Sequence, residues 1–450
     1  MKIGFVSLGC PKNQLDTEVM LHEIASAGHE ITPEETEADI VVINTCAFIE
    51  SAKKESIDNI LDIAWLKKNH TLKGIVVTGC MAERYGKEIL DEFPEVDAVL
   101  GVGSIHKIVE AIECIEKNLG KKKRADCRYF SHEDKETVRL GGDRILTTPE
   151  YSAYLKISEG CDNRCTYCAI PDIRGHFRSR PIDELVAEAR ELDALGVKEL
   201  TVIAQDTTRY GIDLYGKYCL DTLLHRITEE TQIPWIRVLY CYPDKITDGL
   251  IAEMKNNPRI LNYIDLPLQH ISDSVLQRMN RHGKSEMIKD ILAKMKKEIP
   301  DIVIRTTFIV GFPGETEKDF EELAEFIKEQ KFDRAGVFTY SREEGTPAYD
   351  FAQQIDEQTK QDRMDILMKS QLAITERINK AKVGKTITVL CENYDPVSEL
   401  YFGRSEADAP EIDAKVFFKS EKKLLSGEFV KVKIRKVEDY DLFGFALQND

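Results

Sequence analysis

Three cysteines near the middle of the sequence have a spacing that could hold a metal cluster. Cys161, Cys165 and Cys168 follow the pattern C-x₃-C-x₂-C within the stretch ISEGCDNRCTYCAIPDIRGHFRSRP. Cysteine thiolates are the usual ligands of iron–sulfur clusters. A four-iron cluster held by only three cysteines keeps one iron free to bind a small molecule. The spacing therefore predicts a catalytic iron–sulfur site rather than a closed electron carrier.

A zinc knuckle, or an accidental group of cysteines in a loop, could also give this spacing. Zinc sites usually have four protein ligands arranged in pairs. No second cysteine pair follows nearby in the sequence. The iron–sulfur interpretation is therefore favoured over both.

Three further cysteines are predicted to meet at one edge of a parallel sheet. Cys10, Cys46 and Cys80 each end an apolar stretch that reads as a strand, and each stretch precedes an amphipathic helix. The carboxyl ends of parallel strands share one edge, which is where open α/β sheets bind ligands. One such cysteine would more often be a small buried hydrophobe, but three at equivalent positions predict a second cluster with one open iron. Gly9 and Gly79 precede two of them and allow close backbone approach.

The elements that carry Cys10, Cys46 and Cys80 suggest a parallel sheet covered by helices. Strands are expected at 3–10, 38–46, 74–80 and 98–102, and helices near 15–27, 52–68, 82–93 and 105–119. From residue 120 to 150 the sequence becomes polar and aperiodic, with a basic run at Lys121–Arg124. We interpret that stretch as a linker.

Strand–helix alternation resumes after Tyr151 and predicts an open, partial (β/α)6 barrel of the TIM type. Strands are expected at 153–158, 199–205, 236–242, 263–269, 302–312 and 335–341, and helices near 182–195, 220–230, 246–256, 285–298 and 317–330. Active residues of such barrels lie at the carboxyl ends of strands. The residues expected there are Gln205, Asp206, Gln269, His270, Gly311 and Tyr340. The glycine-rich turn that begins at Gly311 suits the close approach of a ligand.

The C-terminal part of the sequence changes to an all-β pattern. A long charged helix is expected at 356–382, with an apolar stripe formed by Ile366, Leu367, Leu372, Ile374 and Ile378. From Gly384 onward the short alternating strands predict a small antiparallel β-barrel. The predicted organisation is thus an α/β domain at 1–120, a linker at 121–145, a partial barrel at 146–380 and a β domain at 381–450.

The overall charge points to a basic partner rather than to nucleic acid. The chain has 62 Lys and Arg against 79 Asp and Glu, a formal charge of −17. Extended contact with a phosphate backbone needs clustered basic residues. Residues 384–450 contain ten basic and thirteen acidic side chains, so strong RNA affinity is not expected. An acidic balance that merely aids solubility is the alternative.

Composition also gives an expectation for the compartment. No stretch of about 18 apolar residues is present, so no membrane span is expected. The N-terminus begins directly with a strand-like sequence and no export signal is expected. Eleven cysteines without an export signal indicate a reducing compartment, and we expect the protein to be cytoplasmic.

The motifs together resemble the methylthiotransferase family of radical S-adenosylmethionine (SAM) enzymes. The three-cysteine motif with Tyr167 before its last cysteine is similar to the radical SAM superfamily, and the flanking domains are similar to an N-terminal three-cysteine domain and a C-terminal TRAM-like module. SLGCPKNQLDTE at Ser7–Glu18 and RGHFRSRP at Arg174–Pro181 are similar to the RimO branch. Branches that modify tRNA tend to carry GCQMN at the first motif.

The resemblance implies a reaction, two cofactors and a substrate. It implies two [4Fe–4S] clusters: one on Cys161, Cys165 and Cys168 that splits SAM to a deoxyadenosyl radical, and one on Cys10, Cys46 and Cys80 that carries the transferred sulfur. It implies methylthiolation of an aspartate β-carbon in the twelfth protein of the small ribosomal subunit. The residues expected to bind SAM are Tyr167, Gln205, Gly311 and Arg174.

The implied partners are this basic ribosomal protein, free or within the ribosome, and an electron donor such as flavodoxin or ferredoxin. The second barrel strand ends in IAQD instead of the GGE often seen in the superfamily, and Gln205 takes the position at which the amino group of SAM would be held. Two alternatives remain: a methylthiotransferase that modifies a tRNA adenosine, which the acidic balance disfavours, and a non-catalytic iron–sulfur electron carrier.

Overall fold

The computed structural model describes residues 1–120 and 128–447, and these form two compact units. The first unit contains residues 1–147, 158–180 and 341–349, and the second contains residues 148–157, 181–340 and 350–450. Residues 158–180, which the sequence assigned to the barrel region, thus have most of their contacts in the first unit. The basic run Lys121–Arg124 lies outside the described residues.

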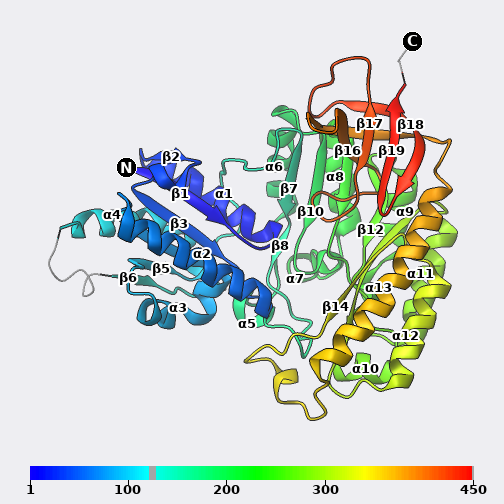
Figure 1. The fold of residues 1–450 in the computed structure, drawn as a ribbon, viewed down its shortest axis with the longest axis horizontal. Helices are drawn as coiled ribbons and strands as arrows, with labels where there is room; N and C mark the ends of the chain where they lie inside the picture. The colour runs from blue at the N-terminus through cyan, green and yellow to red at the C-terminus, as the bar shows by residue number, and fades with distance from the viewer. Residues whose placement is uncertain (121–127, 448–450) are drawn as a thin grey trace. The chain divides into compact units, whose positions relative to one another are not determined.

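The first unit is built on a parallel sheet, shown in blue and cyan in Figure 1. In the described residues this sheet has six strands in the order β2-β1-β3-β4-β5-β6. The strands are β1 (Lys2–Ser7), β2 (Glu30–Thr32), β3 (Ile40–Thr45), β4 (Gly74–Gly79), β5 (Ala98–Leu100) and β6 (Tyr129–Ser131). Every residue of β3 and β4 is buried, which explains why these strands read as continuous apolar runs.

Helices cover both faces of this sheet. They are α1 (Pro11–Ser26), α2 (Glu50–Asn69), α3 (Cys80–Glu92) and α4 (Ile108–Asn118). Apolar side chains of α1 and α4 pack against one face in a core that includes Met20 and Val42. Those of α2 and α3 pack against the other face with Val41 and Val77. The predicted α/β fold of the N-terminal part is confirmed.

Residues 128–147, called the strap here, are attached to the first unit along their length. Strand β6 extends the sheet by pairing with β5 in parallel. Further along, Thr147 donates its backbone N–H to the Glu18 carboxylate at 2.8 Å. The sequence did not predict β2 or β6, because three-residue strands leave too short a pattern.

The remaining elements of the first unit form a small hairpin and a short helix. Strands β8 (Ser158–Glu159) and β9 (Arg178–Ser179) pair in antiparallel fashion. Helix α5 (Ile170–Arg174) lies between them in sequence. Its residue Ile173 joins the core formed by α2 and α3, so the hairpin loop is anchored to the sheet domain by apolar contact.

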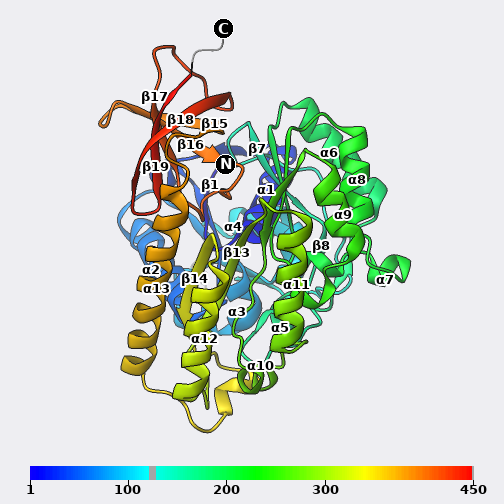
Figure 2. The ribbon, with the colours of Figure 1, turned by 90° about the vertical axis from the view of Figure 1, so that its right-hand side faces the viewer.

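The second unit contains a parallel sheet that curves as a partial barrel (Figure 2). In the part of the chain that the structure describes, its six strands are ordered β14-β13-β12-β11-β10-β7. They are β7 (Ser152–Lys156), β10 (Glu199–Ile203), β11 (Trp235–Val238), β12 (Ile260–Asp265), β13 (Val303–Val310) and β14 (Arg334–Thr339). The helices are α6 (Ile182–Ala194), α7 (Ile212–Tyr215), α8 (Leu220–Glu230), α9 (Asp248–Asn256), α10 (Asp273–Arg278), α11 (Ser285–Glu298) and α12 (Glu317–Gln330). The predicted six-unit partial barrel is confirmed.

Helix α13 (Glu357–Lys380) packs beside β14, and its inward face corrects the sequence prediction. The expected apolar stripe is wrong: Leu367 is buried, but Ile366 is 54% exposed. The buried face consists mainly of Lys360, Arg363, Gln371, Thr375 and Asn379. Most of these side chains bond to groups of the partial barrel, as Gln371 does to the Phe332 carbonyl at 2.8 Å. Such hydrogen bonds reduce the free-energy cost of burying a polar face.

The C-terminal module is a closed five-stranded barrel in the order β15-β16-β17-β19-β18. Its strands are β15 (Thr386–Asp395), β16 (Leu400–Ser405), β17 (Val416–Lys419), β18 (Phe429–Glu438) and β19 (Asp441–Ala446). The predicted small barrel is confirmed, with one parallel pair, β17 with β19, among antiparallel ones. Among the described residues, no helix is long and apolar enough to cross a membrane.

A buried ion triad joins this module to the partial barrel within the second unit. Glu199 on β10 accepts from Arg237 at 2.8 Å and from Arg404 of β16 at 2.5 Å. The Glu199 carboxylate is fully buried. Burial alone would raise the pKa of Glu199, but the two guanidinium groups lower it below its ordinary value.

Candidate functional site

The first cysteine set is defined here as Cys10, Cys46 and Cys80. It lies where three neighbouring strands of the first unit end. Cys46 and Cys80 directly follow β3 and β4, and Cys10 lies three residues beyond β1 and precedes α1. Because β1, β3 and β4 are adjacent and parallel, their carboxyl ends meet at one edge. The order of the sheet reverses between β1 and β3, and such a switch point is where open α/β sheets bind ligands. The structure therefore brings the three cysteines together, as the sequence predicted.

Two glycines let the cysteine loops approach each other. Gly9 has φ +92°, and a Cβ atom there would lie 2.9 Å from the Cys46 Cβ. Gly79 has φ +90°, and a Cβ atom there would lie 2.3 Å from the Asn44 Oδ1 atom. Both positions need the left-handed backbone that glycine adopts without strain. The expected role of these glycines is confirmed.

The thiols of this set are free and affect each other electrostatically. Cys46 and Cys80 are buried and Cys10 is half-buried. Burial, with a contribution from Cys80, raises the pKa of Cys46 to about 12. Burial also raises the pKa of Cys80, while the nearby Arg174 guanidinium acts to lower it. Both thiols thus stay protonated near neutral pH, and a metal that bound them would have to displace the protons.

Asn13 holds two of the three cysteine loops. Its amide donates to the Leu8 carbonyl at 2.7 Å and to the Thr45 carbonyl at 3.2 Å. Leu8 and Thr45 lie beside the Cys10 and Cys46 loops, so one buried side chain fixes both. Asn44 completes the arrangement by donating to the Asn13 carbonyl at 2.7 Å.

The second cysteine set is Cys161, Cys165 and Cys168. It lies on a single loop between β8 and α5. The β8–β9 pairing closes the neck of this loop. Inside it, the Cys161 N–H donates to the Gly175 carbonyl at 3.1 Å, and the Cys168 N–H donates to the Cys165 carbonyl at 3.0 Å. Gly160 has φ +78°, and a Cβ atom there would lie 2.0 Å from the His176 carbonyl oxygen. Local hydrogen bonds and one glycine therefore set the geometry of this loop.

The strap holds the second set against the first unit. Lys135 donates to the Glu83 carboxylate at 2.9 Å and to the Asp172 carbonyl at 2.6 Å, linking α3 to α5. Glu136 accepts from the His176 N–H at 2.8 Å. The stretch interpreted as a linker thus supports the loop that carries Cys161, Cys165 and Cys168.

Arg174 lies between the two cysteine sets. Its side chain is 2% exposed, and its Nη1 atom donates to Asp16 at 2.6 Å and to Glu159 at 3.3 Å. Its Nη2 atom donates to the Asn13 Oδ1 atom at 3.0 Å and to the Cys80 Sγ atom at 3.5 Å. Burial would lower the pKa of Arg174, but Asp16, Cys80 and Glu159 raise it well above its usual value. The guanidinium is therefore a fixed positive charge beside Cys80.

Neither set is a preformed site for one metal ion. No group of three His, Cys, Asp or Glu side chains in the described part of the chain is arranged to hold a single ion. A cluster makes a different demand, because each cysteine binds a different iron. Three thiols on one sheet edge, and three on one loop, are donor sets of the kind that iron–sulfur clusters use, and none of these six cysteines is in a disulfide.

The other predicted site residues divide between the units. Tyr167 is half-buried on the cysteine loop of the first unit. Gln205 and Gly311 lie just past β10 and β13 in the second unit. Gly311 has φ +72°, its N–H donates to Glu315 at 2.8 Å, and a Cβ atom there would lie 2.2 Å from the Lys360 Cγ atom. The packing of α13 is thus one reason for glycine at this position.

Sequence reasoning missed the residues that support the cysteines. Asn13, Asp16, Glu159 and Lys135 were given no role, although the first two stand in the quoted motif CPKNQLD. Their spacing of three residues on one helix was the available signal, because residues i and i+3 share a face. Nothing in the sequence marked Glu159 or Lys135, whose partners are distant along the chain.

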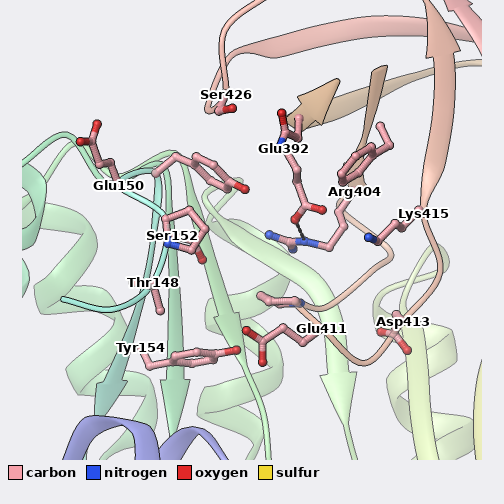
Figure 3. A pocket seen from close by; sticks show the side chains of 15 residues that line it. Thr148, Glu150, Ser152, Tyr154, Glu392, Arg404, Glu411, Asp413, Lys415 and Ser426 are labelled. Atoms are coloured by element: carbon pink, nitrogen blue, oxygen red, sulfur yellow. Dashed lines mark hydrogen bonds and ion pairs between the residues drawn. The ribbon is translucent and has the colours of Figure 1, made fainter. Parts of the chain in front are cut away.

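A pocket of about 560 Å³ lies in the second unit between β7 and the C-terminal module (Figure 3). Carboxylates of Glu150, Glu392, Glu411 and Asp413 line it, and Glu392 pairs with Arg404 at 2.6 Å. None of the predicted site residues contributes to it, and it is not the candidate cluster site.

Comparisons with known proteins match three successive parts of the chain to three families. The sequence profile of the Uncharacterized protein family UPF0004 matches residues 2–101, that of the Radical SAM superfamily matches residues 155–327, and that of the TRAM domain matches residues 383–447. The protein named ribosomal protein uS12 methylthiotransferase RimO from Desulforamulus reducens is 49% identical over 447 residues, which cover 99% of each chain. The RimO protein of Clostridium botulinum strain Eklund 17B is 51% identical over 444 residues, which cover 98% of this chain and 97% of that one.

The chain belongs to the RimO family. It is a methylthiotransferase with the radical SAM fold, and the predicted family and enzyme class are confirmed. Among solved structures, the radical SAM methyltransferase TsrM from Kitasatospora setae, with cobalamin and a [4Fe-4S] cluster bound, has a TM-score of 0.55 and 14% identity. The match covers 77% of this RimO-family chain and 76% of TsrM. At that identity, the likeness concerns the fold alone.

Proposed function

We propose that this chain attaches a methylthio group to the β-carbon of an aspartate in ribosomal protein uS12. The observation that carries the proposal is a pair of three-cysteine sets in a chain that is about half identical, end to end, to proteins named uS12 methylthiotransferase. A C–H bond beside a carboxylate is too weak an acid for an ordinary general base. A radical route therefore suits this substrate.

Each cysteine set has its own part in the proposal. Cys161, Cys165 and Cys168 hold a [4Fe–4S] cluster whose open iron binds SAM, and Cys10, Cys46 and Cys80 hold a second cluster. When bound, the cluster on Cys161, Cys165 and Cys168 would supply, with SAM, a radical that removes a hydrogen atom. The cluster on Cys10, Cys46 and Cys80 would supply sulfur, and a second SAM would supply the methyl group. The chain's own contribution is to fix six thiols and to bury Cys46, Cys80 and Cys165 away from water.

Three residues are proposed to contact SAM: Tyr167, Gln205 and Gly311. Tyr167 precedes Cys168 on the loop, and Gln205 and Gly311 follow strands whose carboxyl ends carry the active residues of barrels. Both terminal nitrogens of Arg174 already donate to protein groups. The proposed role of Arg174 is therefore a different one, described below.

The partners follow from charge and from the need for an electron. The formal charge of −17 favours a basic protein such as one from the small ribosomal subunit over tRNA. Splitting SAM requires a one-electron donor, for which a flavodoxin or ferredoxin is proposed. A substrate of this kind implies a cytoplasmic protein.

The test is incubation of the reconstituted, reduced protein with SAM and either uS12 or tRNA. The expected product is uS12 with an added methylthio mass on one aspartate, together with 5′-deoxyadenosine. Modification of tRNA but not of uS12 would establish the tRNA enzyme instead. Intact SAM after reduction, with both clusters present, would indicate an electron carrier.

A further inference from the structure

The Arg174 side chain bonds to groups that belong to, or hold in place, the loops of both cysteine sets. It donates directly to the Cys80 sulfur and to the Asn13 amide, which in turn holds the loops of Cys10 and Cys46. On the other side it donates to Glu159, two residues before Cys161, and the next residue, Gly175, accepts from the Cys161 N–H. A single buried side chain thus links the two sets.

The charges around Arg174 show what its removal would change. Two carboxylates, Asp16 and Glu159, share this one guanidinium. Arg174, Asp16 and Glu159 are each buried, so solvent screens their charges weakly. Without the guanidinium, the Cys80 sulfur would lose this positive charge and its N–H donor, while the negative charge of Asp16 nearby would remain.

We propose that Arg174 is a positioning residue that couples the two cysteine sets and raises the reduction potential of the cluster on Cys10, Cys46 and Cys80. A positive charge and an N–H···S bond at a ligand sulfur favour the reduced cluster, because reduction adds negative charge. The same guanidinium fixes the loop that carries Cys161 relative to Cys80. This inference rests on the proposed second cluster.

Arginine suits this position better than lysine. Its planar fork offers five donors in fixed directions, and here two nitrogens bond to four groups on α1, α3 and β8. Lysine would keep the positive charge, but its single nitrogen has three donors and could not bond to all four groups at once. Arg174→Lys therefore separates the effect of charge from the effect of position.

The test uses full-length protein in which Cys161, Cys165 and Cys168 are replaced by alanine, so that any cluster present belongs to the other set. The potential of that cluster is measured by a redox titration followed by electron paramagnetic resonance. Arg174→Gln should lower the ratio of reduced to oxidised cluster about tenfold at a fixed potential, equal to about 59 mV for one electron. Asp16→Asn should raise this ratio, because it removes a negative charge while Arg174 stays.

Arg178→Gln is the matched control. Arg178 lies on the same hairpin, but its guanidinium donates to the carbonyls of Lys135 and Val138 rather than toward the cysteines. Its substitution should leave the potential unchanged. Equal potentials in the Arg174→Gln and Arg178→Gln proteins, with the cluster intact, would overturn the inference. If Arg174→Gln does not hold a cluster, Asp16→Asn decides, since an unchanged potential there would overturn it as well.

The proposed coupling between the two cysteine sets gives a second measurement, made in protein that keeps both sets. Arg174→Lys should keep the potential within about threefold of the parent ratio while raising the amount of SAM cleaved per methylthio group transferred about tenfold. An unchanged ratio of cleavage to transfer would overturn the coupling role. Absence of any cluster in the parent alanine variant would instead overturn the second cluster of the proposed function.

Discussion

The two cysteine sets are assembled by opposite structural routes. Cys161, Cys165 and Cys168 come from one loop whose neck is closed by two paired strands. Cys10, Cys46 and Cys80 come from three strand–helix units and meet only because the sheet forms. The first route depends on local hydrogen bonds and the second on the whole sheet domain. The two sets should therefore respond differently to damage of the fold.

The largest effect should come from removing either set. Replacing Cys10, Cys46 and Cys80 by alanine should halve the iron content, abolish methylthio transfer and spare SAM cleavage. Replacing Cys161, Cys165 and Cys168 should also halve the iron but abolish SAM cleavage. An anaerobic iron and sulfide count, with quantification of 5′-deoxyadenosine, checks both. Unchanged iron in the first variant would contradict the convergence of the strand ends as a cluster site.

Glycine substitutions compare the set that depends on the whole sheet with the set that depends on one loop. Gly79→Ala places a Cβ atom 2.3 Å from Asn44 at the centre of the sheet edge, and should lower the free energy of unfolding by about 3 kcal/mol. Gly160→Ala meets the His176 carbonyl at 2.0 Å, but should open only the cysteine loop and leave the melting temperature nearly unchanged. Thermal melting and iron content measure the two effects.

Gly28→Ala is the control for backbone strain alone. Gly28 has φ +85°, yet a Cβ atom there would meet nothing within 4 Å. It should cost about 1 kcal/mol. Equal costs for Gly28→Ala and Gly79→Ala would mean that close packing at the first cysteine set contributes nothing.

Asn13→Ala tests the side chain that joins two loops of the first set. The change leaves the carbonyls of Leu8 and Thr45 without this donor and removes an acceptor from Arg174. Weakening of cluster binding by about 2 kcal/mol is expected, or about thirtyfold faster iron loss to a chelator. Gln14→Ala, whose amide bonds to Thr147 in an exposed contact, should have no such effect. Similar iron loss from both variants would contradict the role of Asn13.

Acid should lower the folding stability of the second unit, which contains neither cysteine set. This loss should be smaller than the effects of the substitutions above. Burial lowers the pKa of His270 to about 3, against an ordinary value of 6.5. The folded state therefore binds fewer protons than the unfolded state below pH 6.5, and stability falls as the pH falls. The loss from pH 6.5 to 5.5 should be about 1 kcal/mol. His270→Gln should reduce this slope in thermal melts, whereas the same change at exposed His225 should not; parallel slopes would refute the assignment.

The sequence was sufficient for the parts of the fold that repeat a pattern. Strand ends at Cys46 and Cys80 could be located because continuous apolar runs stop there, and parallel topology then implies convergence. The inward face of α13 could not be found in this way. Gln371 donates to the Phe332 carbonyl of the partial barrel, and Asn379 donates to the Tyr440 carbonyl of the C-terminal module. A periodicity of apolar residues does not record such partners.

The candidate site was likewise predictable in its ligands but not in its supports. Six cysteines stand out by type and spacing, whereas Arg174 was expected to bind SAM because its environment was unknown. Its burial between Asp16 and Glu159 joins residues 158 and 15 positions apart in sequence. Only the folded hairpin, held by the strap, brings those carboxylates to one guanidinium.

The buried triad of Glu199, Arg237 and Arg404 has a consequence for how the C-terminal module can be handled. Arg404 belongs to the module, and Glu199 begins β10, the strand next to the edge strand β7 of the barrel sheet. A protein shortened after α13 would lose one of the two cations that neutralise this carboxylate, and breaking a buried ion pair from one side costs about 3–5 kcal/mol. Swapping the module for one from a relative would succeed only if the replacement brought an arginine to the same strand. For truncation or exchange, the C-terminal module and the barrel are therefore best treated as a single piece.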